Sequence, residues 1–426
     1  MHRRNPPGLF AGTVATVLVL LATPTSAQSA IEALTFDAVV ARAVEKNPSV
    51  AIAATNILRS EAILQQVRST TRPRLGSTIT STTLDRGRSL GEQTVTPQQQ
   101  SSFVVSASYP VLAASQWAAR AQAEDQVDIA RLSVADVRQQ IAVAAAQAYL
   151  VVITQKRLVE VSRRAIDTAR AQRDYNRTRL EGGLGTRLNL LRSAQEVASD
   201  EAGLEVVQLG VRRAQDALGV LLAADGPIDT AGDPSFEVPT VGGESDWMMA
   251  RPDVQLFAAQ QRAAERVVKD SAKDWWPTGS LAFDPQYLTP SGIFQPSRTW
   301  RFTMLFSQPI FDGGLRRGLK AQRAAALEAA VLSVDHARIR ARAEVRTAQA
   351  AVDAYARALT GARLAATHAN EVLRITILAF EAGASTNIEV IDAQRSTRDF
   401  ETAVAQSEDA VRQARLELLV ALGQFP

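Results

Sequence analysis

Residues 380–394 read FEAGASTNIEVIDAQ, and residues 180–194 read LEGGLGTRLNLLRSA. The two stretches lie 200 positions apart and place acidic, glycine and threonine residues at matching positions. The same offset recurs over most of the chain, for example with LSV at 132–134 and again at 332–334. Self-similarity at one fixed spacing is the signature of a duplicated structural unit. The sequence therefore predicts a tandem repeat that contains this stretch twice.

The duplicated stretch has the composition of a tight turn between two helices. Glycine ends a helix because it adopts the left-handed conformation at no steric cost, and threonine caps the first turn of the helix that follows. We therefore expect helix-to-helix turns at 181–186 and 381–386. Their residues of interest are Gly183, Leu184, Gly185, Thr186, Gly383, Ala384, Ser385 and Thr386.

Long helices are predicted before both turns. No proline occurs from 113 to 180 or from 314 to 380. Each segment is therefore expected to form one helix of roughly 100 Å, at ~1.5 Å per residue. From Val345 to Phe380 the seam residues alternate in steps of three and four, which is typical of a coiled coil. Shorter helices are predicted to return from near 188 to 222 and from near 388 to 422.

Two strands are predicted ahead of each long helix. Apolar and aromatic residues alternate with polar ones in these segments, which are about as long as the ~9 to 11 residues of a tilted transmembrane strand. The same alternation also fits a half-buried hairpin of a soluble protein. The expected strands lie at about 74–84, 101–109, 279–288 and 299–308.

The N-terminus has the pattern of an export signal at 1–27. Arg3 and Arg4 precede an apolar run, and small residues occupy 25–27. Removal of these two arginines takes the formal net charge from +3 to +1, a balance that indicates no nucleic-acid partner. After the signal, no apolar run approaches the ~20 residues of a membrane helix. The 426-residue chain contains no cysteine, so membrane attachment is expected through strands rather than an acyl chain.

The residue inventory provides no catalytic site. His336 and His368 are the two histidines after the signal, and neither has the spacing of a metal site or of a catalytic triad. The Gly313-Gly314 pair lacks the pattern of a phosphate-binding loop. We predict that the chain is not an enzyme, and we nominate no catalytic, cofactor-binding or metal-binding residue.

The strand count indicates that several chains share one sheet. Four strands are too few to close into a barrel, and in lipid the backbone groups at an open sheet edge would lack hydrogen-bond partners. Three copies of the chain would supply twelve strands. In this arrangement the chain resembles the TolC family of outer-membrane efflux proteins over about residues 34–423. The resemblance rests on LTFDAVVARAVEKNPSV at 34–50, SQPIFDGGLRRG at 307–318 and the two turns.

The resemblance implies a mainly α fold with β structure, in repeat units 28–229 and 230–426. A homotrimer would join a coiled-coil helical barrel in the periplasm to a transmembrane β-barrel in the outer-membrane lipid of a Gram-negative bacterium. The implied function is the passive exit duct of a tripartite efflux or type I secretion system. A periplasmic adaptor, docked at the turns, and an inner-membrane pump are the implied partners, and the cargo stays open.

The resemblance also nominates two acids near the second turn. Glu389 and Asp392 lie three residues apart on one helix face, so a trimer would form two rings of three carboxylates at the pore constriction. Composition alone predicts only a solvated helix face there. The first repeat has Asn189 and Arg192 at the matching positions, and we expect Arg192 to offset part of the negative ring.

The residues that would hold the tip closed differ from the family pattern. The best-known closed tip of the family uses Tyr and Arg, where this chain has Phe380 and Ser385. We nominate Phe380 for gating through an apolar contact, together with Asn189 and Arg192. The alternative function is a soluble periplasmic coiled-coil binding or adaptor-like protein, whose strands would be edge hairpins.

Overall fold

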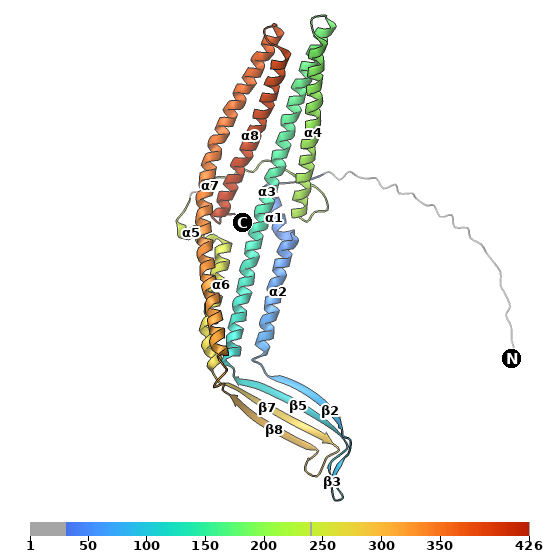
Figure 1. Cartoon of the computed structure of the whole chain (residues 1–426), viewed down its shortest axis with the longest axis vertical. Helices are drawn as coiled ribbons and strands as arrows, with labels where there is room; N and C mark the ends of the chain where they lie inside the picture. Colours follow the sequence, from blue (N-terminus) through green and yellow to red (C-terminus); the bar gives the residue numbers. More distant parts are fainter. Residues whose placement is uncertain (1–30, 239–240, 426) are drawn as a thin grey trace, which may run out of the picture.

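The computed structural model describes residues 31–238 and 241–425. Figure 1 shows an elongated molecule with two helical hairpins at one end, a curved sheet at the other and a waist between them. The predicted export signal at 1–27 lies outside the described residues. The main helices are α1 (Phe36–Lys46), α2 (Pro48–Ser69), α3 (Ala114–Glu181), α4 (Arg187–Leu221), α5 (Glu244–Ala250), α6 (Pro252–Asp270), α7 (Leu315–Glu381) and α8 (Asn387–Ala421), with a 3-10 turn, η1, at Ser271–Trp275.

The helices form one layer in which short helices stack end to end. Above the waist α3 packs against α4 and α8, and α7 packs against α8; below it α3 packs against α2 and α6. Asn47 explains one junction, because its side chain caps α2 at Ser49 N (2.8 Å) and also donates to the carbonyl of Leu221, at the end of α4 (2.9 Å). Arg251 donates in the same way to Ala421 at the end of α8 (3.2 Å). The Asn47-Pro48 pair therefore joins the start of α2 to the end of α4, and the Arg251-Pro252 pair joins the start of α6 to the end of α8.

The sheet has four antiparallel strands in the order β2-β5-β7-β8. These strands span Arg74–Thr83, Gln99–Leu112, Thr278–Thr289 and Arg298–Ser307. A small hairpin of β3 (Arg88–Leu90) and β4 (Gln93–Thr96) lies in the connection between β2 and β5. At the waist β1 (Glu32–Leu34) pairs in parallel with β6 (Ile228–Thr230).

Strand β5 corrects one expectation. The sequence analysis placed this strand at about 101–109, whereas β5 continues past Pro110 to Leu112. Strand β2 begins opposite Ser108, so Pro110 has a strand neighbour only on the β7 side, where it faces Ser280. The missing N–H of proline is tolerated at such an edge position, and the register shifts just after it.

The main core lies at the waist. Tyr149 and Leu150 of α3 and Leu218 of α4 are fully buried there, and the ring of Phe36 meets the ring of Tyr149 edge-on at 5.5 Å. The sequence analysis expected no apolar run long enough for a membrane helix. By length and composition, however, α3 is long and apolar enough to cross a membrane. In the stretch concerned, 44% of the residues are buried inside the molecule, and a single helix of this kind is weak evidence of a membrane span.

Candidate functional site

The four-stranded sheet has one apolar and one polar face. Side chains alternate between faces along a strand, and directly opposed residues share a face. Phe283 is opposite Phe302, Leu281 is opposite Met304, and Phe103 is opposite Tyr287. The other face carries small polar residues and one opposed pair of charges, namely Thr78, Thr80, Ser102, Ser106, Asp284 and Arg301.

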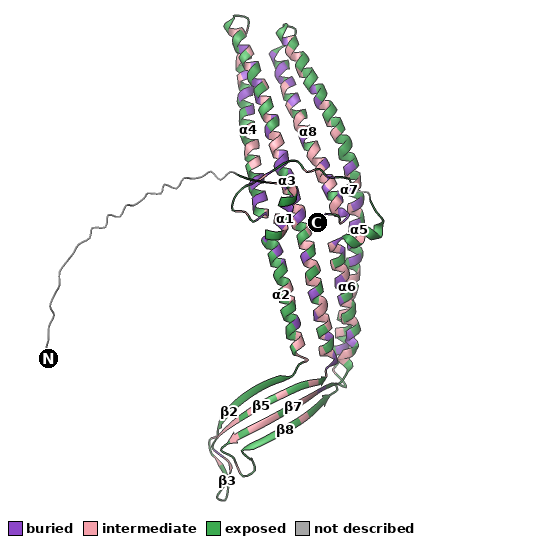
Figure 2. Ribbon diagram, turned by 180° about the vertical axis from the view of Figure 1, so that it is seen from behind, coloured by how far each residue is buried: buried purple, intermediate pink, exposed green. Residues whose placement is uncertain are grey.

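Both edges of this sheet are open within the described residues. Strand β2 pairs only with β5, and β8 pairs only with β7. Figure 2 shows both edge strands exposed along their length, whereas β5 and β7 between them are partly covered. The apolar face also stays uncovered, since Trp300 and Phe302 keep 72% and 59% of their surface exposed. A single chain thus leaves unpaired backbone and a broad apolar surface without a partner.

The two helical tips have the same backbone plan. Gly183 and Gly383 adopt positive φ angles of 74° and 78°, and Thr186 and Thr386 cap the helices that follow. The caps differ. Thr186 accepts from Asn189 N (3.2 Å), whereas Thr386 accepts from Glu389 N and also donates its own N–H to the Glu389 carboxylate (2.8 Å). The second tip therefore has a complete capping box and the first does not.

The two nominated acids have different surroundings. Both are exposed on α8, but the carboxylate of Glu389 already accepts hydrogen bonds from Ser385 Oγ and Thr386 N. These bonds, with Ser385 as the largest contribution, lower the pKa of Glu389. Asp392, one turn further along, stays clear of the cap. The carboxylate of Asp392 is thus not engaged by the helix cap, whereas that of Glu389 is.

The side chain of Phe380 is buried between the hairpins. Its ring meets the ring of Tyr175 at 5.9 Å, and the guanidinium of Arg179 lies 5.6 Å from the ring centre, both from α3 of the same chain. Only 6% of Phe380 is exposed. Sequence reasoning nominated Phe380 but neither of its partners. The matching residue of the first tip, Leu180, is partly exposed.

The match to a family model covers nearly all of the described chain. Residues 39–224 and 247–424 match the model described as outer membrane efflux protein. The chain belongs to the outer membrane efflux protein family. This membership assigns the chain to the outer membrane and agrees with the resemblance found from its motifs.

Relatives and solved structures agree with the family assignment. The chain is 30% identical to the outer membrane protein OprJ of Pseudomonas aeruginosa over 43% of its length, and the match spans 39% of OprJ. The crystal structure of a membrane protein from Pseudomonas aeruginosa superposes with a TM-score of 0.81 at 22% identity, covering 91% of this chain and 93% of that one. The open state of the MtrE outer membrane channel of Neisseria gonorrhoeae gives 0.77 at 20% identity, with 91% and 88% covered. These structural likenesses show the fold.

A buried polar cluster, missed by the sequence analysis, joins the two tips of this efflux-family chain. The side-chain carbonyl of Asn387, the first residue of α8, accepts hydrogen bonds from Gln172 (2.9 Å) and Asn176 (2.8 Å) of α3. Asn176 also donates to Ser193 of α4 (3.3 Å), and Asn387 donates to the carbonyl of Asn189 (3.4 Å). Gln172 and Asn176 lie four residues apart on one helix face, which was a detectable pattern.

Asn189 and Arg192, two further nominated residues of the first tip, both lie in the first turns of α4. Asn189 is half-buried and contributes through its backbone, because its N–H donates to Thr186 and its carbonyl accepts from Ser193 and Asn387. Arg192 is exposed on α4. The nominated turn residues are exposed or half-buried at the tips, and Leu184 has 77% of its surface exposed.

Ion pairs continue the contact between hairpins below the tips. The Nε of Arg395 in α8 donates to both carboxylate oxygens of Glu196 in α4 (2.9 and 3.0 Å). Arg398 donates to the carboxylate of Asp200 (2.6 Å). The side chains of Glu196 and Asp200 are only 4% and 7% exposed. Burial raises the pKa of Asp200 even though Arg398 opposes the shift. Buried carboxylates are tolerated here because each has an arginine partner.

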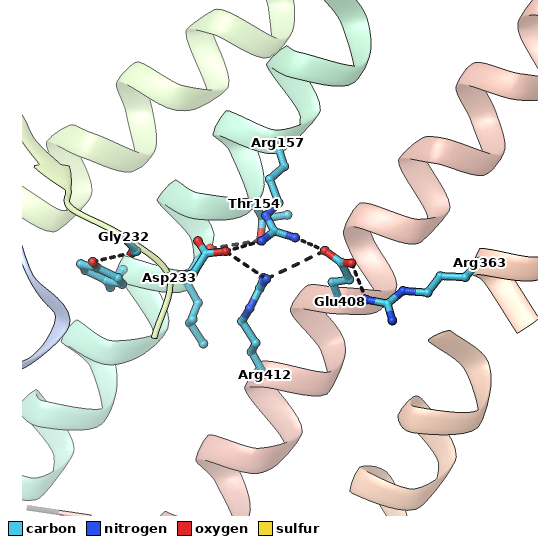
Figure 3. Close-up of polar contacts among 9 residues, drawn as sticks. Thr154, Arg157, Gly232, Asp233, Arg363, Glu408 and Arg412 are labelled. Carbon is cyan, nitrogen blue, oxygen red and sulfur yellow. Dashed lines mark hydrogen bonds and ion pairs between the residues drawn. The ribbon is translucent and has the colours of Figure 1, made fainter. Parts of the chain in front are cut away.

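At the waist, Asp233 and Glu408 link three helices through ion pairs: Asp233 pairs with α3 and α8, and Glu408 of α8 pairs with α3 and α7. Figure 3 shows Arg157 of α3 between Asp233 and Glu408, with Arg412 and Arg363 reaching the same two acids. Asp233 belongs to the segment after β6, and the hydroxyl of Tyr149 fixes that segment by donating to the carbonyl of Gly232 (2.9 Å). The waist therefore holds α3, α7 and α8 in register through charged contacts.

Proposed function

We propose that this chain is the passive exit duct of a tripartite efflux or type I secretion system, and that three copies close one channel. The open sheet edges carry this proposal. Strands β2 and β8 have unpaired backbone on opposite sides of the sheet, so β8 of one copy can pair with β2 of the next. Three copies of four strands give a closed barrel of twelve, which satisfies every backbone group in lipid.

The helical layer supports the same ring. Helices α4 and α7 form its two flanks, because α3 and α8 lie between them. Both flanking helices expose apolar side chains, which a neighbouring copy would cover. A head-to-tail contact of this kind closes a ring when its rotation divides the circle evenly. The exposed residues include Leu188, Leu191, Val206 and Leu209 on α4, and Leu332, Ile339, Leu364, Val372 and Ile375 on α7.

The two faces of the sheet suit a pore through a membrane. We infer that the apolar face, with Phe103, Phe283 and Phe302, faces lipid, and that the polar face lines the passage. Asp284 and Arg301 would then place opposite charges at one level of the pore wall. These charges balance, so we assign ion selectivity to the tips rather than to the barrel.

The tips support different roles in the duct. We infer that Asp392 forms the main acidic ring of the constriction, with Glu389 contributing less because its carboxylate also caps α8. The turn of the first tip exposes Leu184 (77%), Leu188 (55%) and Leu191 (56%), a surface that suits apolar docking of a periplasmic adaptor. The adaptor would connect the duct to an inner-membrane pump.

The soluble alternative receives less support. A soluble coiled-coil protein does not need a sheet whose apolar face is uncovered and whose edges are both open. The outer-membrane family also favours the duct. The matching family and folds are those of channel proteins, and we propose no catalytic activity. The cargo is not assigned.

The mass of the detergent-extracted protein tests the closed ring. The protein is purified from an outer-membrane fraction, and light scattering with the detergent contribution subtracted gives the protein mass per particle. We expect three chains of 45.9 kDa each, less any cleaved signal. A monomer that stays soluble without detergent would contradict the duct and favour the soluble coiled coil.

A further inference from the structure

An arginine-rich groove lies at the waist, between α3, α7 and α8. Four arginines and a single carboxylate line it, over an apolar floor of Leu359 and Val411, and its volume is about 380 Å³. The exit function proposed above does not use this groove. We refer to it as the arginine groove, and its charged residues are Arg157, Arg363, Glu408, Arg412 and Arg415.

The acids around the groove are already shared between several arginines. Glu408 accepts from Arg157 and from Arg363 (2.8 Å), and Arg412 lies 3.9 Å from it. Asp233, from the loop, is shared by Arg157 and Arg412. Each carboxylate thus has at least two cationic partners.

Arg415 has no acidic partner in the described residues. Its Nη1 donates to the backbone carbonyl of Phe236 (3.2 Å). Asp409 is the remaining acid near Arg412 and Arg157; burial raises its pKa, and the two arginines oppose that shift. The four arginines therefore outnumber the three nearby acids, Glu408, Asp233 and Asp409.

Two donors of the groove arginines also lack partners. Arg412 Nη1 and Arg415 Nε are buried and form no hydrogen bond within the described residues. Burial and, after it, the neighbouring Arg157 lower the pKa of Arg412, whereas Asp233 and Asp409 oppose the shift. A buried donor without an acceptor is costly, so an added acceptor would stabilise this arrangement.

We propose that the arginine groove binds a tetrahedral oxyanion of the phosphate class, held by Arg363, Arg412 and Arg415. The planar fork of guanidinium donates two parallel hydrogen bonds to a phosphate, and three such groups from two helices can surround it. Rotation of the Arg412 and Arg415 side chains would give their unpaired donors an acceptor. Phosphate is a mixture of monoanion and dianion near neutral pH and would offset the cationic excess.

Calorimetric titration of the full chain, extracted in detergent, tests this proposal. The ligand is inorganic phosphate in a chloride buffer of constant ionic strength. We expect one site per chain, with an affinity at least about tenfold lower in Arg415→Gln and Arg363→Gln. Arg363 is 61% exposed, so its loss leaves the fold intact even if replacement of the more buried Arg415 does not.

Arg338→Gln is the matched control, since Arg338 is an exposed arginine on the same helix, α7, paired with Asp335 (3.8 Å). It is expected to bind phosphate as the parent does. Glycerol phosphate in a second titration distinguishes the source: equal affinity indicates a phosphate group carried on a larger molecule, and weaker binding indicates the free ion. Absence of phosphate binding, or equal losses in Arg338→Gln and Arg363→Gln, would overturn the proposal.

Discussion

The two helical tips have one backbone plan but different contacts. Both turn through a left-handed glycine and start the next helix at a threonine cap. The first tip exposes Leu184 and Leu191. At the second, the residues matching Leu180 and Leu191 are the buried Phe380 and Ile391. A duplicated sequence thus keeps the turn and changes what the turn contacts: apolar side chains stay exposed at the first tip and are buried at the second.

Removal of the aromatic contact is expected to have the largest effect. Phe380→Ala should destabilise the second hairpin by about 3 kcal/mol, since the ring is buried and packs against Tyr175 and Arg179. Leu180→Ala, at the matching place in the first tip, should cost about 1 kcal/mol because that side chain is partly exposed. Denaturant unfolding of the two variants measures the difference. Equal losses would show that the tips do not differ as described.

Asn387→Ala tests the buried polar cluster. Gln172 and Asn176 would lose their shared acceptor, with an expected loss of about 2 kcal/mol. Arg187 begins α4 as Asn387 begins α8, and it is exposed, so Arg187→Ala is the matched control and should change stability by less than about 0.5 kcal/mol. The same unfolding measurement applies. A neutral Asn387→Ala would mean that water replaces the lost acceptor.

The caps provide a smaller contrast. Thr386→Ala should lose about 1.5 kcal/mol, because the Thr386 hydroxyl belongs to a reciprocal capping box with Glu389. Thr186→Ala should lose about 1 kcal/mol, since Thr186 forms the single bond to Asn189. Hydrogen exchange of the first turns of α4 and α8 reports each cap locally. Greater loss of protection in α4 than in α8 would reverse the comparison.

Charge at the tips is expected to set the preference for cations. In the proposed trimer, Asp392→Asn would remove a ring of three acids and should lower the cation-to-anion permeability ratio about threefold. Arg192→Gln, at the matching position, should raise the ratio about twofold. Reversal potentials in a salt gradient give both values. If Arg192→Gln leaves the ratio unchanged, Arg192 does not offset the ring.

The smallest expected effect is the pH dependence of the second cap. Glu389 has a pKa below its ordinary value of 4.5 in the folded chain, mainly through the hydrogen bond from Ser385. A lowered pKa adds stability that is complete above 4.5 and is lost as the pH falls through the folded value. The stability difference between the parent and Glu389→Gln should therefore shrink as the pH falls below 4.5. A difference that grows in acid would contradict this assignment.

The features that sequence could predict were local ones. The glycine turns, the two proline-free helices and the alternating strands follow from backbone chemistry and period, and they lie where expected. The extension of β5 past Pro110 depends on where β2 begins, which a single strand does not encode. The cluster at Asn387 requires α3, α4 and α8 to meet, so distant residues decide it. The sequence analysis nominated Phe380 but not its partner Tyr175, because their contact depends on how α3 and α7 meet.

Single-channel conductance in a planar lipid bilayer tests most directly whether the fixed second tip narrows the duct. Parent protein, Asn387→Ala and the matched Arg187→Ala are each inserted from detergent. We expect discrete channel steps from all three, with a raised resting conductance in Asn387→Ala alone. Equal conductance in Asn387→Ala and Arg187→Ala, or no channel steps from the parent protein, would contradict the account.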